Sequence, residues 1–155
     1  MELNQKFADF TLQTDEDKTA SLSDYAGKPV VLFFYPRADT PGCTIEACGF
    51  RDTFKKLQAA GAVVLGISRD TPKAQAKFRA KYDLPYTLLA DVDEKVCKQF
   101  GVLKEKNMYG KKVMGIERTT FVIGPDRTLL HIFPKVTPQG HAEEVLALIK
   151  GMKRS

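Results

Sequence analysis

Continuous apolar runs alternate along this chain with amphipathic stretches. Residues 29–35 and 62–68 are uninterrupted apolar runs rich in β-branched and aromatic side chains, which is typical of strands buried on both faces of a sheet. Shorter runs predict further strands at 86–90, 119–123 and 128–133. Residues 124–126, Gly-Pro-Asp, form a turn sequence between the last two strands.

Helix signals stand between these runs. We expect a helix over 40–60, because Thr40 is a good N-cap, Pro41 suits a first turn, and Gly61 ends the pattern. Its apolar positions recur with spacings of four and three: Cys43, Ala47, Phe50, Phe54 and Leu57. Three more helices are predicted: 71–82 and one from 137, each opened by Thr-Pro, and a short helix capped by Asp93 and ending at 100–101.

The order of these elements indicates an α/β layer architecture. Strands alternate with helices, and a hairpin and a closing helix follow, which favours a central sheet with helices packed on it. Residues 9–25 alternate weakly around an acidic turn and predict a small hairpin or edge strand. With 155 residues and no repeat or linker, we expect one domain over 1–155.

Composition and charge indicate which classes of protein this chain can belong to. The chain is 43% hydrophobic and 28% charged, which is ordinary for a globular protein. No apolar stretch approaches the roughly 20 residues that span a bilayer, and the N-terminus lacks a signal-peptide pattern, so we expect a cytoplasmic protein without membrane contact. The net charge is +5, but acidic residues are interspersed, so nucleic-acid binding stays a minor alternative that salt-sensitive binding would reveal.

Three cysteines, Cys43, Cys48 and Cys97, carry the candidate chemistry. An odd number without a signal peptide argues against a disulfide framework. His131 and His141 are the only histidines, and too few well-spaced ligands remain for zinc. We therefore expect neither a metal nor a cofactor, and the cysteines are either reactive or simply buried.

Cys43 lies in the first turn of the helix that follows the buried strand. Free amides and the positive helix pole favour a thiolate there. A thiol of ordinary pKa is only about 3% ionised at pH 7, and ionising most of it requires about 3.4 kcal/mol. The helix end contributes about 0.3–1 kcal/mol. A cation and further donors must supply the rest, and candidates are the Thr40 hydroxyl, the amides of Gly42 and Cys43, Arg37, and a more distant arginine.

Cys48 follows five residues later on the same helix. On an intact helix the two cysteines lie about 140° apart around the axis, with Cα atoms roughly 8.6 Å apart. A disulfide needs Cα atoms within about 7 Å, so the first turns must unwind before the two sulfurs can join. The plain alternative is that both are small hydrophobes in an amphipathic helix.

The segment around Cys43 resembles a known family. Pro36, Thr40 and Cys43 match the Pro-x-x-x-Thr-x-x-Cys signature of the peroxiredoxins, and TPGCTIEACGFRD is similar to their bacterioferritin comigratory protein (PrxQ) branch. Arg118, in Glu-Arg-Thr-Thr-Phe, matches the family's active-site arginine strand. The resemblance extends from about residue 5 to 150, although Phe7-Ala8-Asp9-Phe10 lacks the proline common at the start of the family.

This resemblance implies a thioredoxin-like fold, with a central mixed β-sheet flanked by helices and an N-terminal β-hairpin. It implies a thiol peroxidase for hydrogen peroxide and organic hydroperoxides, recycled by thioredoxin and commonly monomeric. Cys43 would be the peroxidatic cysteine and Cys48 the resolving one, joined through a sulfenic acid into an intramolecular disulfide. The implied supporting roles are peroxide binding by Thr40 and Arg118, shielding by Pro36, and orientation of the arginine by Glu46.

These residues also fit other interpretations. We expect Cys97 to be a buried core thiol, and it is the reserve candidate for the resolving role. A cysteine phosphatase needs Cys-x5-Arg, but Gly49 and Phe54 stand at those positions, and a cysteine hydrolase needs a partner histidine that no motif here supplies. The sequence leaves open the preferred peroxide, the physiological reductant and the oligomeric state.

Overall fold

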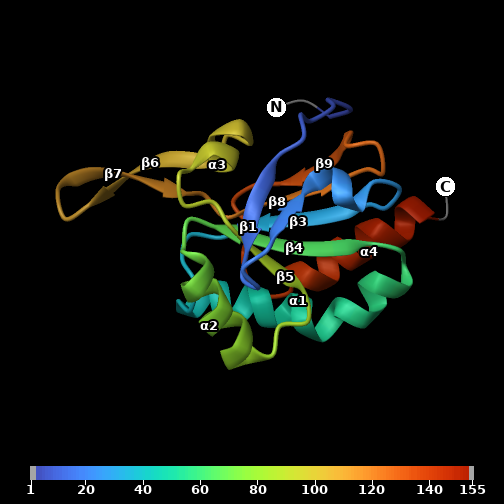
Figure 1. Cartoon of the computed structure of the whole chain (residues 1–155), viewed down its shortest axis with the longest axis horizontal. Helices are drawn as coiled ribbons and strands as arrows, with labels where there is room; N and C mark the ends of the chain where they lie inside the picture. The colour runs from blue at the N-terminus through green and yellow to red at the C-terminus, as the bar shows by residue number, and fades with distance from the viewer. Residues whose placement is uncertain (1–2, 154–155) are drawn as a thin grey trace.

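A seven-stranded mixed sheet runs through the centre of the computed structural model, which describes residues 3–153 (Figure 1). Its strand order is β2-β1-β5-β4-β3-β8-β9. The strands are β1 (Thr11–Thr14), β2 (Thr19–Ser21), β3 (Val30–Phe34), β4 (Val63–Ser68), β5 (Thr87–Ala90), β8 (Thr119–Ile123) and β9 (Leu129–Phe133). β3, β4 and β5 are mutually parallel, and all other pairs are antiparallel.

Helices cover both faces of this sheet. One face carries α1 (Pro41–Ala59), α2 (Pro72–Tyr82) and α4 (His141–Lys153), and the other carries the short α3 (Lys95–Gln99) and the 3-10 helix η1 (Leu22–Tyr25) (Figure 1). The α/β class, the mixed central sheet and the N-terminal hairpin β1–β2 are thus confirmed. None of the helices within residues 3–153 has the length and apolar character needed to cross a bilayer.

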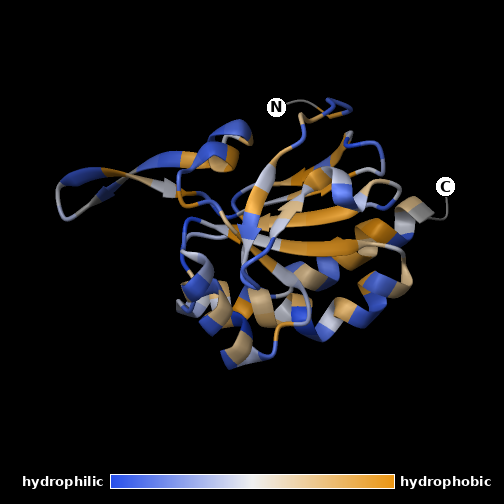
Figure 2. Ribbon diagram, viewed as in Figure 1, coloured by the Kyte–Doolittle hydropathy of each residue, from blue (hydrophilic) through white to orange (hydrophobic). Residues whose placement is uncertain are grey.

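Side chains of strand β3 pack alternately into two hydrophobic cores, one on each face of the sheet. Val31, Phe33 and Tyr35 pack into the core under α1 and α4, whereas the residues between them pack into the core on the α3 side. Phe33 stacks on Phe50 of α1 with ring centroids 4.6 Å apart. Figure 2 shows the resulting pattern, with hydrophobic strands inside and polar outer helix surfaces. The prediction of a strand buried on both faces is confirmed, and this packing fixes the start of α1 against the sheet.

Two predicted helix starts were wrong. The last helix begins at His141 rather than 137, because Gly140 adopts φ +76°, a left-handed conformation that interrupts any helix begun at Pro138. The short helix α3 has Glu94 at its N-cap instead of Asp93. Two amides in its first turn, those of Val96 and Cys97, donate hydrogen bonds at 3.2 and 2.7 Å to the carboxylate of Asp91, which precedes the helix.

A second, two-stranded sheet was not predicted. It consists of β6 (Leu103–Met108) and β7 (Lys111–Ile116), a ribbon that projects from the body of the protein (Figure 1). Most of its side chains that the structure describes are exposed on both sides, so the sequence carries no alternation of apolar and polar positions there. Arg118 stands two residues beyond this ribbon.

Candidate active site

Cys43 lies where strand β3 turns into helix α1. Thr40 is the N-cap residue in an extended conformation, and Pro41 occupies the first turn, as predicted. The carbonyl of Thr40 accepts the first helical hydrogen bond from the amide of Thr44 at 2.8 Å. The Cys43 side chain is only 1% exposed and packs into the core beneath α1. The sulfur therefore sits at the positive end of a 19-residue helix, in a nearly water-free environment.

Arg118 reaches this sulfur from a segment 75 residues away. Strand β8 pairs with β3 so that Thr119 lies opposite Phe34. Arg118, the residue before Thr119, therefore lies beside the end of β3, from which the chain continues to α1. Arg118 Nη2 donates a hydrogen bond to Cys43 Sγ at 3.4 Å. The Arg118 carbonyl accepts from the Val136 amide at 2.9 Å, which fixes its backbone. The cation that the sequence required near Cys43 is thus a distant arginine, and Arg37 is exposed.

Glu46 holds the other side of the same guanidinium. Arg118 Nη1 donates to Glu46 Oε1 at 2.9 Å, while Glu46 Oε2 is buried without a hydrogen-bond partner among the described residues. Burial raises the pKa of Glu46 from 4.5 to about 7, against the attraction of Arg118. Burial works to lower the pKa of Arg118, but Glu46 and Cys43 more than offset it, so that pKa is raised. Two acidic groups thus share one permanent cation.

Gly42 makes room for the guanidinium. A Cβ atom at this position would lie 2.9 Å from Arg118 Nη2 and 3.6 Å from Pro138 Cγ. The first distance is closer than real Cβ contacts allow, so a side chain here would displace Arg118. The sequence suggested only the Gly42 amide as a donor, and no pattern in it revealed this requirement for space.

The Thr40 hydroxyl points elsewhere than expected. Thr40 Oγ1 donates to the carbonyl of Arg37 at 2.9 Å and makes no capping hydrogen bond to α1. It therefore stabilises the turn before the helix rather than the Cys43 sulfur. Pro36, half-buried, lies in the same loop at the end of β3.

Two aspartates, which the sequence did not single out, hold this loop. Asp70 Oδ2 accepts from the Ala38 amide at 2.8 Å and from Ser68 Oγ at 2.6 Å. Asp39, at φ +61°, forms an ion pair with Lys81 at 2.9 Å and accepts from the Tyr82 hydroxyl at 2.9 Å. The loop is therefore tied to β4 and to α2.

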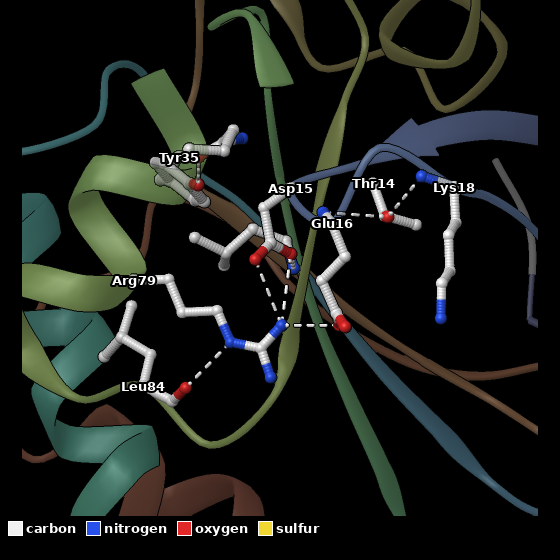
Figure 3. A network of polar contacts seen from close by, with 9 residues as sticks. Thr14, Asp15, Glu16, Lys18, Tyr35, Arg79 and Leu84 are labelled. Atoms are coloured by element: carbon white, nitrogen blue, oxygen red, sulfur yellow. Dashed lines mark hydrogen bonds and ion pairs between the residues drawn. The ribbon is translucent and has the colours of Figure 1, made fainter. Parts of the chain in front are cut away.

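Helix α2 is itself anchored to the N-terminal hairpin. Figure 3 shows Arg79 between the carboxylates of Asp15 and Glu16, at 3.1 and 3.0 Å, and its Nε donates to the Leu84 carbonyl at 3.0 Å. Tyr35, also drawn there, donates its hydroxyl to the side chain of Gln75 on α2. These contacts make α2 a fixed support for the loop that precedes Cys43.

The three thiols are free and occupy different environments. Cys48 is half-buried on α1, and burial raises its pKa. The helix is continuous through both Cys43 and Cys48, which matches the geometry that demands unwinding. The buried hydroxyl of Tyr86 donates to the Ala47 carbonyl at 2.6 Å, directly before Cys48. Cys97 is fully buried in the core on the other face of the sheet, where burial and a hydrogen bond with Asp91 raise its pKa.

Neither histidine contacts the sulfur in this arrangement. His141 is buried, with Nε2 2.8 Å from Thr120 Oγ1, and it packs edge-on against Phe50 and Phe133. Burial lowers its pKa, so it is neutral at pH 7. Over residues 3–153, no group of three or more His, Cys, Asp or Glu side chains is arranged to hold a metal. The groups that the structure brings together at the start of α1 are a thiol, a guanidinium and a carboxyl group.

Comparison with known proteins identifies the family. Residues 3–132 match the AhpC/TSA family, and the chain belongs to that family. It is 54% identical over 146 residues to a putative peroxiredoxin bcp of Coxiella burnetii, covering 94% of this chain and 97% of that protein. It is 43% identical over 152 residues to the peroxiredoxin Bcp of Bacillus subtilis, covering 98% and 97%.

Solved structures give the same result. A PrxQ mutant of Xylella fastidiosa superimposes with a TM-score of 0.94 at 37% identity, covering 98% of this chain and 97% of that one. A bacterioferritin comigratory protein of Xanthomonas campestris, solved to study its alkyl peroxide reduction activity, gives a TM-score of 0.89 at 40% identity, covering 93% and 92%. The expected thioredoxin-like fold and the resemblance to the Bcp/PrxQ peroxiredoxins, which are thiol peroxidases, are confirmed.

Proposed function

We propose that this chain reduces hydrogen peroxide and organic hydroperoxides with Cys43 as the nucleophile. The observation that carries the proposal is the hydrogen bond from Arg118 Nη2 to Cys43 Sγ at the buried start of α1. A thiolate held by a guanidinium and a helix end has the charge stabilisation that a nucleophilic cysteine needs. We further propose that the chain acts as one domain over 1–155 and as a monomer.

The first step is an attack of the Cys43 thiolate on the terminal oxygen of the peroxide. The S–O bond forms as the O–O bond breaks, which leaves Cys43 as a sulfenic acid, and the leaving oxygen takes a proton to become water or an alcohol. Arg118 lies where it stabilises the negative charge that moves from sulfur to oxygen. Following the resemblance, Thr40 and Arg118 bind the peroxide, and Pro36, half-buried in the loop before α1, shields the thiolate.

The second step joins Cys43 to Cys48. The Cys48 thiolate attacks the sulfenic sulfur, water leaves, and an intramolecular disulfide forms. Because both residues lie on one continuous helix, α1 must unwind over the turns between them. An external dithiol, which the resemblance indicates is thioredoxin, then reduces the disulfide through a mixed disulfide. The alkyl peroxide reduction activity studied in the Xanthomonas relative supports organic hydroperoxides as substrates.

Single substitutions separate these steps. Cys43→Ser should abolish peroxide consumption with thioredoxin, thioredoxin reductase and NADPH, whereas Cys97→Ser should retain it. A Cys43→Ser protein that still turns over peroxide would refute the nucleophile assignment. Intact-mass analysis after one equivalent of peroxide should show loss of two hydrogens in the wild type. It should show a gain of one oxygen in Cys48→Ser. Peptide mapping that finds residue 43 bridged to 97 would overturn the role of Cys48.

A further inference from the structure

Two acidic side chains on α1 compete for a single cation. Cys43 and Glu46 stand one turn apart and contact the two terminal nitrogens of Arg118, at 3.4 and 2.9 Å. Each of the two residues is only 1% exposed. If the thiolate and the carboxylate were both ionised, the buried cluster would carry one uncompensated negative charge, which a medium without water disfavours strongly.

No further cation among the described residues relieves this excess. The other titratable groups that interact with the cluster are Tyr35 and Tyr86, whose pKa values burial raises well above the usual one, and His141 of α4, whose pKa burial lowers. Within residues 3–153, moreover, Glu46 Oε2 has no hydrogen-bond partner. An ionised carboxylate with one orphaned, buried oxygen is costly, and a protonated one much less so.

We propose that Cys43 and Glu46 share one proton in the reduced protein, and that Glu46 gives it up when Cys43 becomes a sulfenic acid. This inference rests on the proposed peroxidase function. It gives Glu46 a second role besides orienting Arg118. Glu46 acts through Arg118: it is neutral while the thiolate is the counter-ion of the guanidinium, and it becomes the counter-ion once the thiolate is consumed.

The step balances in atoms and charge. Before reaction the cluster holds a thiolate, a guanidinium and a carboxylic acid, with no net charge. The peroxide transfers its terminal OH to sulfur, and the leaving oxygen takes up one proton while Glu46 releases one. Afterwards the cluster holds a sulfenic acid, a guanidinium and a carboxylate, again with no net charge. The solvent neither gains nor loses a proton. The pKa of Glu46, about 7, agrees with a proton that is available at neutral pH.

Proton counting tests this exchange. The Cys48→Ser protein stops at the sulfenic acid, so one equivalent of hydrogen peroxide gives a single turnover. In weak buffer at pH 7, a pH indicator reports the protons taken from solvent, and the absorbance of the thiolate reports how much thiolate is consumed. With Glu46 present, the uptake should be close to zero per thiolate. With Glu46→Gln added, it should rise to about one. Glu143→Gln, an exposed acid on α4, is the matched control and should give the value of the parent protein.

Glutamine keeps the carbonyl oxygen that accepts from Arg118, so a purely orienting role would survive this substitution with unchanged proton uptake. An uptake of about one proton per thiolate in both proteins would overturn the proposal. A parent protein that consumes no peroxide would instead refute the proposed function. A second measurement needs no substitution of Glu46: the infrared carbonyl band of a protonated carboxyl group should disappear from the Cys48→Ser protein on oxidation. Its persistence would also overturn the proposal.

Discussion

Substituting Gly42 by alanine tests whether the space beside Cys43 matters as much as its charges. The Cβ atom would lie 2.9 Å from Arg118 Nη2, whereas ordinary contacts begin at 3.4 Å, so the guanidinium must move by about 0.5 Å. Arg118 is the part that yields, because its side chain is the flexible partner in this contact. It moves away from α1 and therefore away from the sulfur.

The cost of this movement follows from the geometry. Lengthening the separation of Nη2 and Sγ from 3.4 to about 3.9 Å weakens the attraction by about 0.6 kcal/mol at an effective dielectric constant near 20. Weakening the charge-assisted hydrogen bond adds about 1 kcal/mol. The total of about 1.6 kcal/mol predicts a rate constant for peroxide reduction about 15-fold below that of the wild type.

Stopped-flow measurement of the first oxidation step gives this rate constant directly. Gly49→Ala is the matched control, because it makes the same substitution on the same helix, and its Cβ atom would meet Ala142 Cβ at an ordinary 3.5 Å. We expect Gly49→Ala to react at the wild-type rate and to be more stable by up to about 1 kcal/mol. A Gly42→Ala protein that also reacts at the wild-type rate would show that the position of Arg118 does not limit the reaction.

Three further outcomes are expected. Between pH 4.5 and pH 8, the unfolding free energy of the wild type should fall by up to about 3 kcal/mol relative to that of Glu46→Gln, as measured by urea titration at both pH values. The reason is that a carboxyl with pKa raised from 4.5 to about 7 stabilises the fold below 4.5 and loses that stabilisation as pH rises through 7. Tyr86→Phe should lower stability by about 1 kcal/mol and speed disulfide formation, because α1 loses the bond to Ala47. Native alkylation followed by mass spectrometry should modify Cys48 well before Cys97.

Each of these has a clear contrary result. A stability difference between Glu46→Gln and wild type that is the same at both pH values would mean that Glu46 ionises freely in the fold. Unchanged kinetics of disulfide formation in Tyr86→Phe would show that this hydroxyl does not restrain unwinding. Alkylation of Cys97 at the rate of Cys48 would show that its core opens readily.

The sequence predicted the framework of the site because strong local signals lie there. The run 29–35 is apolar throughout, and Thr40-Pro41 marks a helix start without help from the rest of the chain. Both follow from short-range chemistry, and together they place Cys43 at the end of a helix that lies on the sheet. The prediction that a cation was needed came from the energy of ionising a thiol, and Arg118 was singled out only by the family resemblance.

Other features depend on contacts that local patterns do not encode. Asp91 accepts from the amides of Val96 and Cys97 in α3, whereas Asp93 accepts only from that of Lys95, at 3.5 Å. The clearance at Gly42 exists only once Arg118 arrives from β8. The ribbon β6–β7 buries too little on either side to leave an alternating pattern. The orphaned oxygen of Glu46 is likewise a product of tertiary packing.

The central sheet also decides which thiols can ever meet. Three cysteines allow three pairings, but the central sheet separates Cys97 from α1, which carries the other two. Unwinding a few turns of α1 leaves the sheet intact, so the two pairings that include Cys97 would require the sheet itself to open. The fold thereby insulates a spare sulfur from its own chemistry, and the chain keeps a third cysteine without the hazard of scrambled bridges.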